Sequence, residues 1–237
     1  MMQLTFLGTS SMVPTKERNQ IAVFLSYGTV GILFDCGEGT QRQFKIAGIS
    51  LQKVTKILIS HWHGDHVLGI PGLMQTLSST NYEGTLEIYG PNGTKKRMEK
   101  MFEAFVFDKK LDFVVNEIKE ETFFESGDFK IEAYRLEHGI ETLGFRFIEK
   151  DKRKVDMKKA KKLGIQEGPL IGKLQQGHSI EHKGKKIGPD DVTYVEKGKI
   201  VAYVTDTILC DGCYKAAQDA YLLVCEATYS SMLVDKS

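Results

Sequence analysis

The segment from Ile59 to His66 constrains the chain more than any other part of the sequence. It reads Ile-Ser-His-Trp-His-Gly-Asp-His and places four metal-capable side chains, His61, His63, Asp65 and His66, within six residues. Two histidines at positions i and i+2 of an extended segment project to the same side. A tight turn at Gly64 lets Asp65 and His66 aim at a neighbouring point. One short loop can therefore seat two metal ions, and a loop that merely exposes histidines is the alternative.

Length and composition favour one sizeable α/β domain over residues 1–237, because 237 residues suit a single deep core better than two independent ones. The hydrophobic fraction of 41% and the charged fraction of 27% are ordinary for a globular protein. Lysine and arginine together number 32 against 31 acidic residues. This balance indicates no polyanionic partner, so any such partner must be recognised by local clusters.

The cysteines and the apolar segments predict a cytoplasmic protein. Cys36, Cys210, Cys213 and Cys225 do not form the pattern of a secreted disulfide scaffold. The chain opens directly into a strand pattern, without a signal-like leader, and no apolar run approaches the roughly 18 residues that span a bilayer. Cys210-Asp-Gly-Cys213 has the spacing of a zinc or redox pair, but without a second pair or a nearby histidine we favour plain thiols.

Strand and helix patterns alternate along most of the chain. Strands are predicted over residues 2–7, 21–27, 29–35, 54–60, 86–89, 111–115, 129–136, 143–148, 192–194, 200–204 and 220–225. Helices are predicted over 37–47, from about Pro71, from Thr94 to about Phe107, and over 211–218. This alternation predicts helices outside a pair of packed sheets.

Residues 150–190 differ from the rest and predict an arm that projects from the domain. The segment is poor in aromatic residues, rich in lysine and interrupted by glycines. Its first part contains eight cations, Lys150, Lys152, Arg153, Lys154, Lys158, Lys159, Lys161 and Lys162, against Asp151 and Asp156. This surplus would attract a phosphate backbone, and a solvated helix face is the alternative. For His178 and His182, solvent exposure or RNA contact is favoured over metal binding.

Two further metal ligands are predicted at the ends of strands. His138 follows the strand pattern of 129–136, and Asp206 follows that of 200–204. Imidazoles with one bridging carboxylate favour a pair of zinc ions, with manganese and iron as alternatives. Such a pair activates water for hydrolysis at phosphorus, and Asp65 is the best candidate for general base. Asp35 could orient a ligand, although capping of a turn is the favoured role for it.

These residues resemble the metallo-β-lactamase superfamily, in which a His-x-His-x-Asp-His loop is followed by an isolated histidine and by an aspartate after a strand. Further stretches resemble the ribonuclease Z branch, the tRNA 3′-processing endoribonucleases. They are Phe6-Leu7-Gly8-Thr9 with Pro14 and Arg18-Asn19, Phe34 to Gln43, Ile59 to His66, Gly69 to Leu73, Tyr203 to Thr207, and Glu226-Ala227-Thr228. Together these stretches cover nearly the whole chain.

The resemblance implies a four-layer αβ/βα sandwich of the metallo-β-lactamase type with a protruding arm. It implies two zinc ions, one held by His61, His63, His138 and Asp206, and the other by Asp65, His66 and the shared Asp206. Family members clamp precursor tRNA with an arm that carries a Gly-Pro motif, which matches Gly168-Pro169 here. Within the arm, Lys158, Lys159, Lys161 and Lys162 are the expected RNA contacts. Relatives of this compact form are often homodimers in which one subunit's arm serves the other.

The sequence departs from the family pattern in two ways. Beyond the Glu-Ala-Thr motif the family carries a His-x-Thr segment and a Leu-Thr-His motif, and the sequence ends at Ser237 before either. We therefore expect an incomplete second metal site, and a truncated chain or a protein with impaired catalysis. Cys225 stands where many relatives have histidine, and a packing role is expected for it.

The resulting hypothesis is a zinc-dependent endoribonuclease that removes the 3′ trailer of precursor tRNA by attack of metal-activated water. One alternative is a tRNA-binding protein with an incomplete metal site and little catalysis. Another is a small-substrate phosphodiesterase on the same fold, which a long basic arm disfavours because a small substrate has no use for one.

Overall fold

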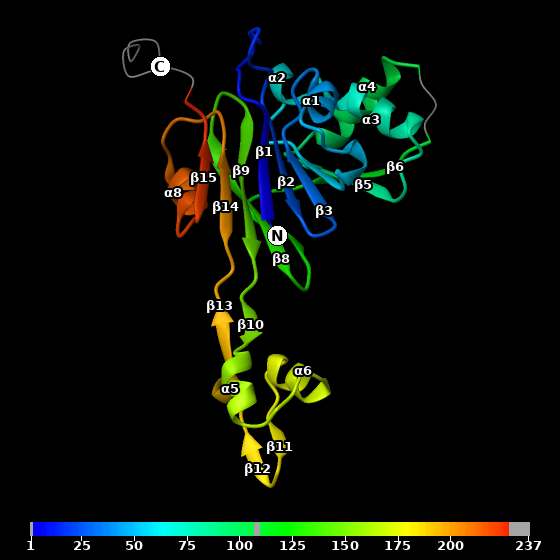
Figure 1. The fold of residues 1–237 in the computed structure, drawn as a ribbon. Coiled ribbons are helices and arrows are strands. Elements are labelled where there is room, and N and C mark those ends of the chain that lie inside the picture. Colours follow the sequence, from blue (N-terminus) through cyan, green and yellow to red (C-terminus); the bar gives the residue numbers. More distant parts are fainter. Residues whose placement is uncertain (1, 107–109, 228–237) are drawn as a thin grey trace.

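Two β-sheets packed face to face form the centre of the molecule (Figure 1). The computed structural model describes residues 2–106 and 110–227. The first sheet has the order β1-β2-β3-β4-β5-β6. Its strands are β1 (Met2–Gly8), β2 (Ala22–Tyr27), β3 (Val30–Phe34), β4 (Lys56–Leu58), β5 (Thr85–Gly90) and β6 (Asp112–Glu117). The first three strands are antiparallel, and β3 to β6 are parallel.

The second sheet has the order β15-β14-β9-β8-β7. Its strands are β7 (Glu121–Glu125), β8 (Phe129–Glu137), β9 (Glu141–Glu149), β14 (Ile200–Val204) and β15 (Leu222–Cys225). Only β14 and β15 run parallel to each other, and they are joined by a crossover that contains helix α8 (Asp211–Ala217). Their carboxyl ends therefore lie side by side at one edge of the sheet.

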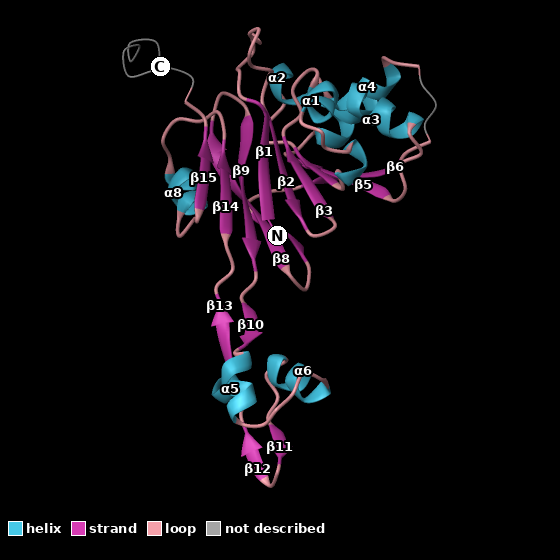
Figure 2. Cartoon of the chain, viewed as in Figure 1, coloured by secondary structure: helices cyan, strands magenta, loops and turns pink. Residues whose placement is uncertain are grey.

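The alternation of side chains along the strands divides the apolar residues between two layers. On β2, Val23 and Leu25 pack against the second sheet, whereas Phe24 packs against helices on the outer face. These helices are α1 (Thr40–Ile46), α3 (Ile70–Ser79) and α4 (Thr94–Glu103). Helix α8 covers the outer face of the second sheet through Ala216. The layers run helix, sheet, sheet, helix, which confirms the predicted αβ/βα sandwich (Figure 2).

The arm, residues 152–196, extends from the end of the second sheet that lies away from α2 (Gly64–Val67) (Figure 1). It contains β10 (Lys152–Val155), α5 (Met157–Lys162), α6 (Pro169–Gln175), β11 (Ile180–His182), β12 (Lys185–Ile187), α7 (Pro189–Val192) and β13 (Thr193–Glu196). It has an apolar cluster of its own, which includes Ile165, Leu174, Ile180 and Val192. The predicted arm is thus a small folded unit.

The arm continues the pairing of the strands from which it grows. In the second sheet, Ile148 of β9 pairs with Ile200 of β14. Four residues further along each strand, Lys152 of β10 pairs with Glu196 of β13. Between these pairs, the backbone N–H of Gly198 donates to Asp151 at 3.0 Å. The antiparallel register is therefore unchanged across the neck.

Several element predictions differ from the structure, and the helix predicted over 37–47 is limited to Thr40–Ile46. The strand predicted over 54–60 is limited to Lys56–Leu58, because the residues after it curve into the loop of residues 59–66, here called the histidine loop. Helix α4 ends at Glu103, and the predicted end at Phe107 lies outside the described residues. Strand β7 was not predicted, since glutamates flank its two phenylalanines and a bulge interrupts its pairing. Among the described residues, no helix is long and apolar enough to cross a bilayer.

Candidate metal centre

The histidine loop is fixed by backbone hydrogen bonds to both sheets. The N–H of Ile59 donates to the carbonyl of Tyr89 at 2.8 Å, and the carbonyl of Ser60 accepts from the N–H of Leu143 on β9 at 3.0 Å. The carbonyl of His66 accepts from the N–H of Cys36 at 2.7 Å. Because these bonds hold the loop from three directions, its side chains are positioned before any ligand binds.

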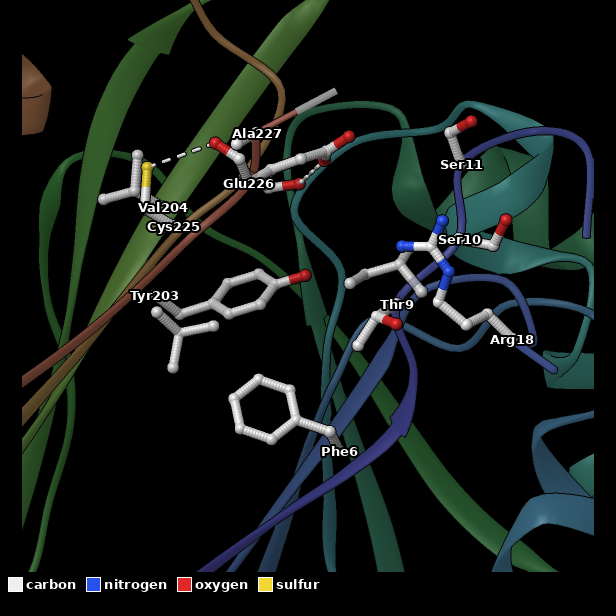
Figure 3. Close-up of a pocket in the computed structure, with 13 residues that line it drawn as sticks. Phe6, Thr9, Ser10, Ser11, Arg18, Tyr203, Val204, Cys225, Glu226 and Ala227 are labelled. Atoms are coloured by element: carbon white, nitrogen blue, oxygen red, sulfur yellow. Dashed lines mark hydrogen bonds between the residues drawn. The ribbon is translucent and has the colours of Figure 1, made fainter. Parts of the chain in front are cut away.

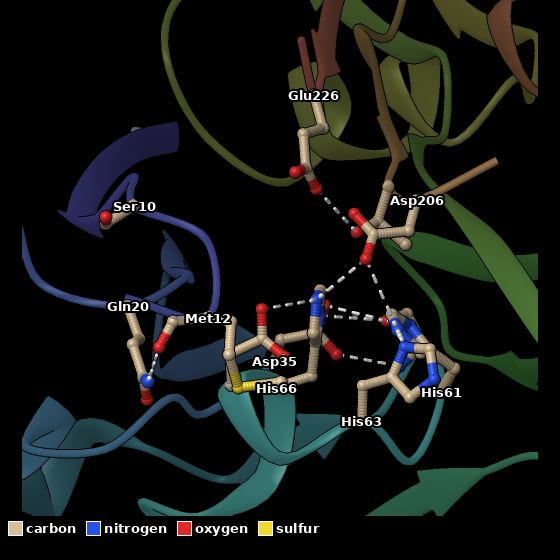
Figure 4. Close-up of polar contacts among 12 residues, drawn as sticks. Ser10, Met12, Gln20, Asp35, His61, His63, His66, Asp206 and Glu226 are labelled. Carbon is tan, nitrogen blue, oxygen red and sulfur yellow. Dashed lines mark hydrogen bonds and ion pairs between the residues drawn. The ribbon is translucent and has the colours of Figure 1, made fainter. Parts of the chain in front are cut away.

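The imidazoles of His61, His63 and His138 converge at the carboxyl ends of the strands, and Figure 4 shows the first two beside Asp206. His61 Nε2 lies 3.1 Å from His63 Nδ1, and His138 Nε2 lies 3.2 Å from the same His63 atom. Asp206 Oδ2 lies 3.5 Å from His61 Nε2 and 3.9 Å from His138 Nε2. These four residues come from the histidine loop, the β8–β9 turn and the end of β14.

The spacing of these atoms fits a tetrahedral ion. Ligand bonds of about 2.0–2.1 Å to zinc place ligand atoms about 3.3 Å apart. Three of the four separations given above are between 3.1 and 3.5 Å, and the fourth, from His138 Nε2 to Asp206 Oδ2, is 3.9 Å. In addition, Asp206 Oδ1 is buried and accepts no hydrogen bond from the residues that the structure describes. A buried carboxylate oxygen without a partner is costly, and a cation would satisfy it.

The electrostatics of Asp206 agree with this interpretation. Burial alone would raise the pKa of its carboxyl group, but hydrogen bonds from His61 and His66 outweigh burial and hold that pKa far below its usual range. For His63, burial and the neighbouring His61 lower the pKa of the imidazole. An ionised carboxylate beside a neutral imidazole is the protonation state that binds a cation.

A second group of ligand atoms lies beside the first and shares Asp206 with it. His66, Asp206 and Glu226 bring one ligand atom each within 4.8 Å of one another. Asp65 Oδ2 lies 3.7 Å from His66 Nε2, and this nitrogen is 3.5 Å from Asp206 Oδ2. The structure thus brings together the predicted Asp65, His66 and Asp206 and adds Glu226.

Glu226 was absent from the predicted ligands, although its position follows from the same rule as that of Asp206. Val204 at the end of β14 pairs in parallel with Cys225 at the end of β15. The residues that follow these two strands must therefore be neighbours. Recognition of β14 and β15 as a parallel pair, which their helical crossover permits, would have identified Glu226 from the sequence.

Asp35 does not cap a turn, and the favoured prediction for it was wrong. Its carboxylate is fully buried and accepts hydrogen bonds from the Ser60 backbone N–H (2.8 Å), the Ser60 hydroxyl (2.8 Å) and the Tyr203 hydroxyl (2.7 Å). His66 Nδ1 lies 2.8 Å from the same carboxylate. Asp35 thereby orients His66 so that Nε2 faces Asp206, the role of an outer carboxylate that fixes a ligating imidazole.

Charge pairing with Asp35 changes the titration of His66. Burial by itself lowers the pKa of this imidazole, but the carboxylates of Asp35 and Asp206 outweigh burial and raise the pKa to about 10. The pKa of the Tyr203 hydroxyl is raised well above its usual value by burial and by the same Asp35 charge. Tyr203 therefore remains a hydrogen-bond donor to Asp35.

Trp62 ties the histidine loop to helix α4. Its indole N–H donates to the Thr94 hydroxyl at 2.9 Å, and that hydroxyl donates to the Pro91 carbonyl at 2.6 Å. The Arg97 guanidinium lies 5.7 Å from the centre of the Trp62 ring. Because Trp62 stands between His61 and His63, this anchor restrains the backbone that carries both.

The metal centre opens to solvent on one side. A wide depression of about 790 Å³ is lined by His138, Asp206 and Glu226 among other residues. Beside it, a smaller cavity of about 200 Å³ lies between the loop after β1 and the ends of β14 and β15. Phe6, Arg18 and Glu226 line this cavity (Figure 3). Among the described residues, His138, Asp206 and Glu226 therefore border an open depression.

The structure divides the eight cations of the first part of the arm into two sets. Four form ion pairs: Lys150 with Glu125, Lys152 with Glu149, Arg153 with Asp190, and Lys154 with Glu196. The other four, Lys158, Lys159, Lys161 and Lys162, are exposed on α5 and form no ion pair with another described residue. The predicted surplus of charge is therefore concentrated on α5.

A groove of about 600 Å³ runs between α5 and the β11–β12 hairpin. Lys159, Lys162, Lys183, Lys185 and Lys186 line it.

Gly168 and Pro169 begin helix α6, where Gly168 has a φ of 152° that favours glycine and Pro169 occupies the first turn. His178 is exposed and His182 Nε2 lies 3.1 Å from the Gly164 carbonyl, so neither belongs to the metal centre. Cys225 is exposed, which corrects its expected packing role.

Comparisons with known proteins identify relatives of the chain by sequence and by structure. A family model described as Anti-Pycsar protein Apyc1 matches residues 2–158. Ribonuclease Z of Methanothermobacter thermautotrophicus is 40% identical over 238 residues, which span 100% of this chain and 78% of the relative. The crystal structure of human tRNase Z, short form, has a TM-score of 0.71 at 27% identity, and the match covers 100% of this chain and 81% of the human chain.

The metallo-β-lactamase fold protein YhfI from Bacillus subtilis has a TM-score of 0.51 at 20% identity. The match covers 62% of this chain and 58% of that protein. At this level of identity the likeness shows the fold, which agrees with the four layers described above.

Proposed function

The chain belongs to the ribonuclease Z family, a group of metal-dependent endonucleases with the metallo-β-lactamase fold, and from this we propose that it removes the 3′ trailer of precursor tRNA. The proposed enzyme uses two zinc ions, with manganese as the alternative, and acts as a homodimer in the cytoplasm, where it meets its RNA substrate. The observation that carries the proposal is the convergence of three imidazoles on Asp206, whose second oxygen accepts no hydrogen bond from any described residue.

The residues of the centre divide the work between binding and proton transfer. His61, His63, His138 and Asp206 would hold one ion, and Asp65, His66, Asp206 and Glu226 would hold the other. Bound divalent ions would activate a water molecule and stabilise negative charge at phosphorus. Asp65, only 5% exposed and beside His66, is the residue that we assign as general base. Asp35 maintains the orientation of His66 throughout.

The arm is assigned to the body of the tRNA. Its exposed lysines on α5 and in the adjoining groove offer several charges to a phosphate backbone. The nine residues of β9 separate the base of the arm from the His138 turn by about 30 Å. Because the arm points away from the metal centre of its own chain (Figure 1), an arm that serves the partner subunit in a dimer is the arrangement that we propose.

The first test is cleavage of a 3′-extended precursor tRNA in the presence of zinc or manganese. Wild-type chain should cut at the trailer junction and leave a 3′-hydroxyl on the tRNA, and Asp65→Asn should lose most of this cleavage. Asp151→Asn, which changes an exposed aspartate at the neck, is the control and should cut at the wild-type rate. Equal cleavage by wild type and Asp65→Asn would contradict the assignment of Asp65.

The second test separates RNA binding from chemistry. Replacement of Lys158, Lys159, Lys161 and Lys162 by glutamine should weaken tRNA binding and make it less dependent on salt, since each lost phosphate contact reduces the slope of log K against log salt by about 0.9. Hydrolysis of a small phosphodiester should be unchanged. A charge-matched control replaces Lys45, Lys53, Lys100 and Lys119, four exposed lysines of the body. Equal effects of both quadruple variants would refute a specific role of the arm.

The third test concerns the dimer. Asp65→Asn chains are mixed with chains in which the four lysines of α5 are replaced by glutamine, so that some dimers contain one chain of each kind. Such a heterodimer has one intact metal centre and one intact arm, on different subunits. Such a mixture should regain cleavage if an arm serves its partner's centre. It should remain inactive if each arm serves its own chain. Light scattering of the wild type gives the oligomeric state independently.

Two other functions remain as alternatives. A tRNA-binding protein with little turnover would bind precursor tRNA in the second test but leave it uncut in the first. A small-substrate phosphodiesterase would hydrolyse the small phosphodiester, ignore tRNA and be indifferent to the arm lysines. The free lysines on α5 favour the nuclease over this last alternative.

A further inference from the structure

Two cysteines lie together at the start of helix α8, outside the metal centre. Cys210 is the N-cap residue of α8, and Cys213 is in its first turn. Their sulfur atoms are 3.6 Å apart. The helix crosses between the parallel strands β14 and β15. A Cys-x-x-Cys pair at the amino end of the helix of a β-α-β unit is the arrangement of dithiol redox motifs.

The surroundings of the pair favour redox chemistry over metal binding. The two potential metal-binding groups among the described residues contain neither cysteine. In the described part of the chain, no further ligand lies close enough to complete a zinc site with the two sulfurs. Both sulfurs approach the loop that precedes the helix: Cys210 Sγ lies 3.7 Å from the Thr207 hydroxyl, and Cys213 Sγ lies 3.7 Å from the Ile208 carbonyl.

The geometry requires only a small movement to form a bond. The sulfur separation of 3.6 Å must fall to about 2.05 Å in a disulfide. Rotation of the two side chains can supply this change, because residues three apart at a helix start lie on the same side. Cys36 is fully buried and Cys225 Sγ lies 3.5 Å from the Glu226 carbonyl, whereas the sulfurs of Cys210 and Cys213 lie next to each other, so these two are matched.

The local environment also activates one of the thiols. Burial would raise the pKa of Cys210, but the backbone N–H of Cys213 and the Thr207 hydroxyl act against burial, and the net effect lowers that pKa. For Cys213, burial raises the pKa. The thiolate is the reactive form in exchange with a disulfide. Cys210 is buried, and Cys213 is the more exposed of the two thiols.

We propose that Cys210 and Cys213 form a reversible dithiol–disulfide site whose co-substrate is the disulfide of a small thiol. The thiolate of one of the two cysteines attacks one sulfur of the small disulfide, whose S–S bond breaks and releases one thiolate. The thiolate of the other cysteine then attacks the protein sulfur of this mixed disulfide, forms the internal S–S bond and releases the second small thiolate. The two released thiolates take up the two protons that the cysteines lost. The protein dithiol is oxidised and the small disulfide is reduced to two thiols.

The site lies on the connection that carries Asp206. Thr207, next to Asp206, both accepts from the N–H of Glu137 and donates to its carbonyl, each at 3.1 Å. The Ile208 N–H donates to the same carbonyl at 2.9 Å. The pair is therefore attached to the end of β8, immediately before His138. The inference itself does not depend on the proposed nuclease function, because it is read from the thiols alone.

The test is equilibration of the full chain with mixtures of reduced and oxidised glutathione. The samples are quenched with acid, unfolded and alkylated, and thiols are counted by mass spectrometry. Of the four cysteines, the free thiols of Cys210 and Cys213 should disappear together without a glutathione adduct. Dithiothreitol should restore both thiols. Cys213→Ser should instead accumulate a glutathione adduct at Cys210. In the control Cys225→Ser, the free thiols of Cys210 and Cys213 should still disappear.

A change in total glutathione distinguishes the internal disulfide from mixed disulfides. At a fixed ratio of reduced to oxidised glutathione, a tenfold rise in the total should lower the ratio of internal disulfide to dithiol about tenfold, because two thiols are released. A mixed disulfide at Cys225 should not respond. Independent adducts on Cys210 and Cys213, or oxidation of Cys225 while the pair stays reduced, would overturn the proposal. Cys210→Ser repeats the test in case Cys213→Ser folds poorly.

Discussion

At the scale of single residues, Asp35 contributes more than its position in the sequence indicates. It satisfies two donors of Ser60, the Tyr203 hydroxyl and the His66 imidazole from a fully buried site. The sequence shows only an aspartate at a strand end before a turn, which is the usual place of a capping residue. Its backbone φ of 53° is compatible with either role. The distinction arises from the burial around it.

Asp35→Asn should lower the affinity for zinc by about 10–100-fold, because the amide no longer orients and charges His66 as a carboxylate does. A competition titration with a chromophoric chelator measures this affinity. Asp151→Asn, in an exposed carboxylate that also accepts a backbone N–H, serves as the control and should bind zinc like the wild type. Unchanged affinity in Asp35→Asn would remove Asp35 from the centre.

Trp62→Phe should destabilise the fold by about 1 kcal/mol, through loss of its hydrogen bond to Thr94 and the weaker attraction of Arg97 to the ring. It should also release zinc faster, since the anchor between His61 and His63 is lost. Tyr82→Phe removes a comparable bond, from the Tyr82 hydroxyl to the Val54 carbonyl. This control should lose similar stability in urea unfolding without faster release of zinc.

The predicted ligands His61, His63, His138 and Asp206 illustrate how far sequence reasoning reaches. His61 and His63 were predicted from the spacing of histidines in one loop, and His138 and Asp206 from their positions at the ends of strands, and the structure brings the four together. Glu226 obeys the same rule but was missed, because the neighbour of β14 in the sheet was not deduced. Ligand positions follow from local pattern, whereas the pairing of strands depends on contacts between distant segments.

At the scale of elements, the arm is stabilised by its own residues. Glycines, lysines and few aromatic residues predicted a projection, and the projection is present. Its apolar cluster and the ion pairs of β10 were not foreseen, because isolated isoleucines and leucines show no period over such short elements. The positive charge on β10 is neutralised by ion pairs such as that of Lys154 with Glu196 on the paired strand β13. The lysines of α5 form no ion pair with a described residue.

Leu174→Ala should unfold the arm without unfolding the body. Leu174 is fully buried in the arm cluster, and truncation of such a residue costs about 2–5 kcal/mol. Hydrogen exchange should rise across residues 152–196 and stay slow in the two sheets. Leu77→Ala, equally buried beneath the first sheet, should raise exchange throughout the body. Uniform exchange in Leu174→Ala would show that arm and body unfold together.

At the scale of the whole molecule, the sequence predicted the layers but not the direction of the arm relative to the centre. The four layers follow from alternation of strands and helices. That the arm leaves the far end of β9 follows only from the pairing of β9 with β14. This separation makes the arm and the centre independent in structure, and the proposed function requires them to cooperate in substrate binding.

Replacement of residues 152–196 by a short glycine-serine turn should leave a folded body that binds zinc with wild-type affinity. Precursor tRNA should bind far more weakly, with a shallower salt dependence, while a small phosphodiester is still hydrolysed. Circular dichroism and chelator competition verify the body, and gel shift measures tRNA. Retention of tRNA affinity would assign RNA binding to the body instead.

The unbroken register across the neck also determines how the arm can change in length. Side chains of a strand alternate between the two faces, so removal of one residue from β10 and one from β13 would turn the lysine helix to the opposite side of the molecule. Removal of two residues from each strand would return α5 to its original side and bring it about 7 Å closer to the two sheets. Reach and orientation are thus linked, and arms of this kind can be resized only in even steps if they are to present the same face to a substrate.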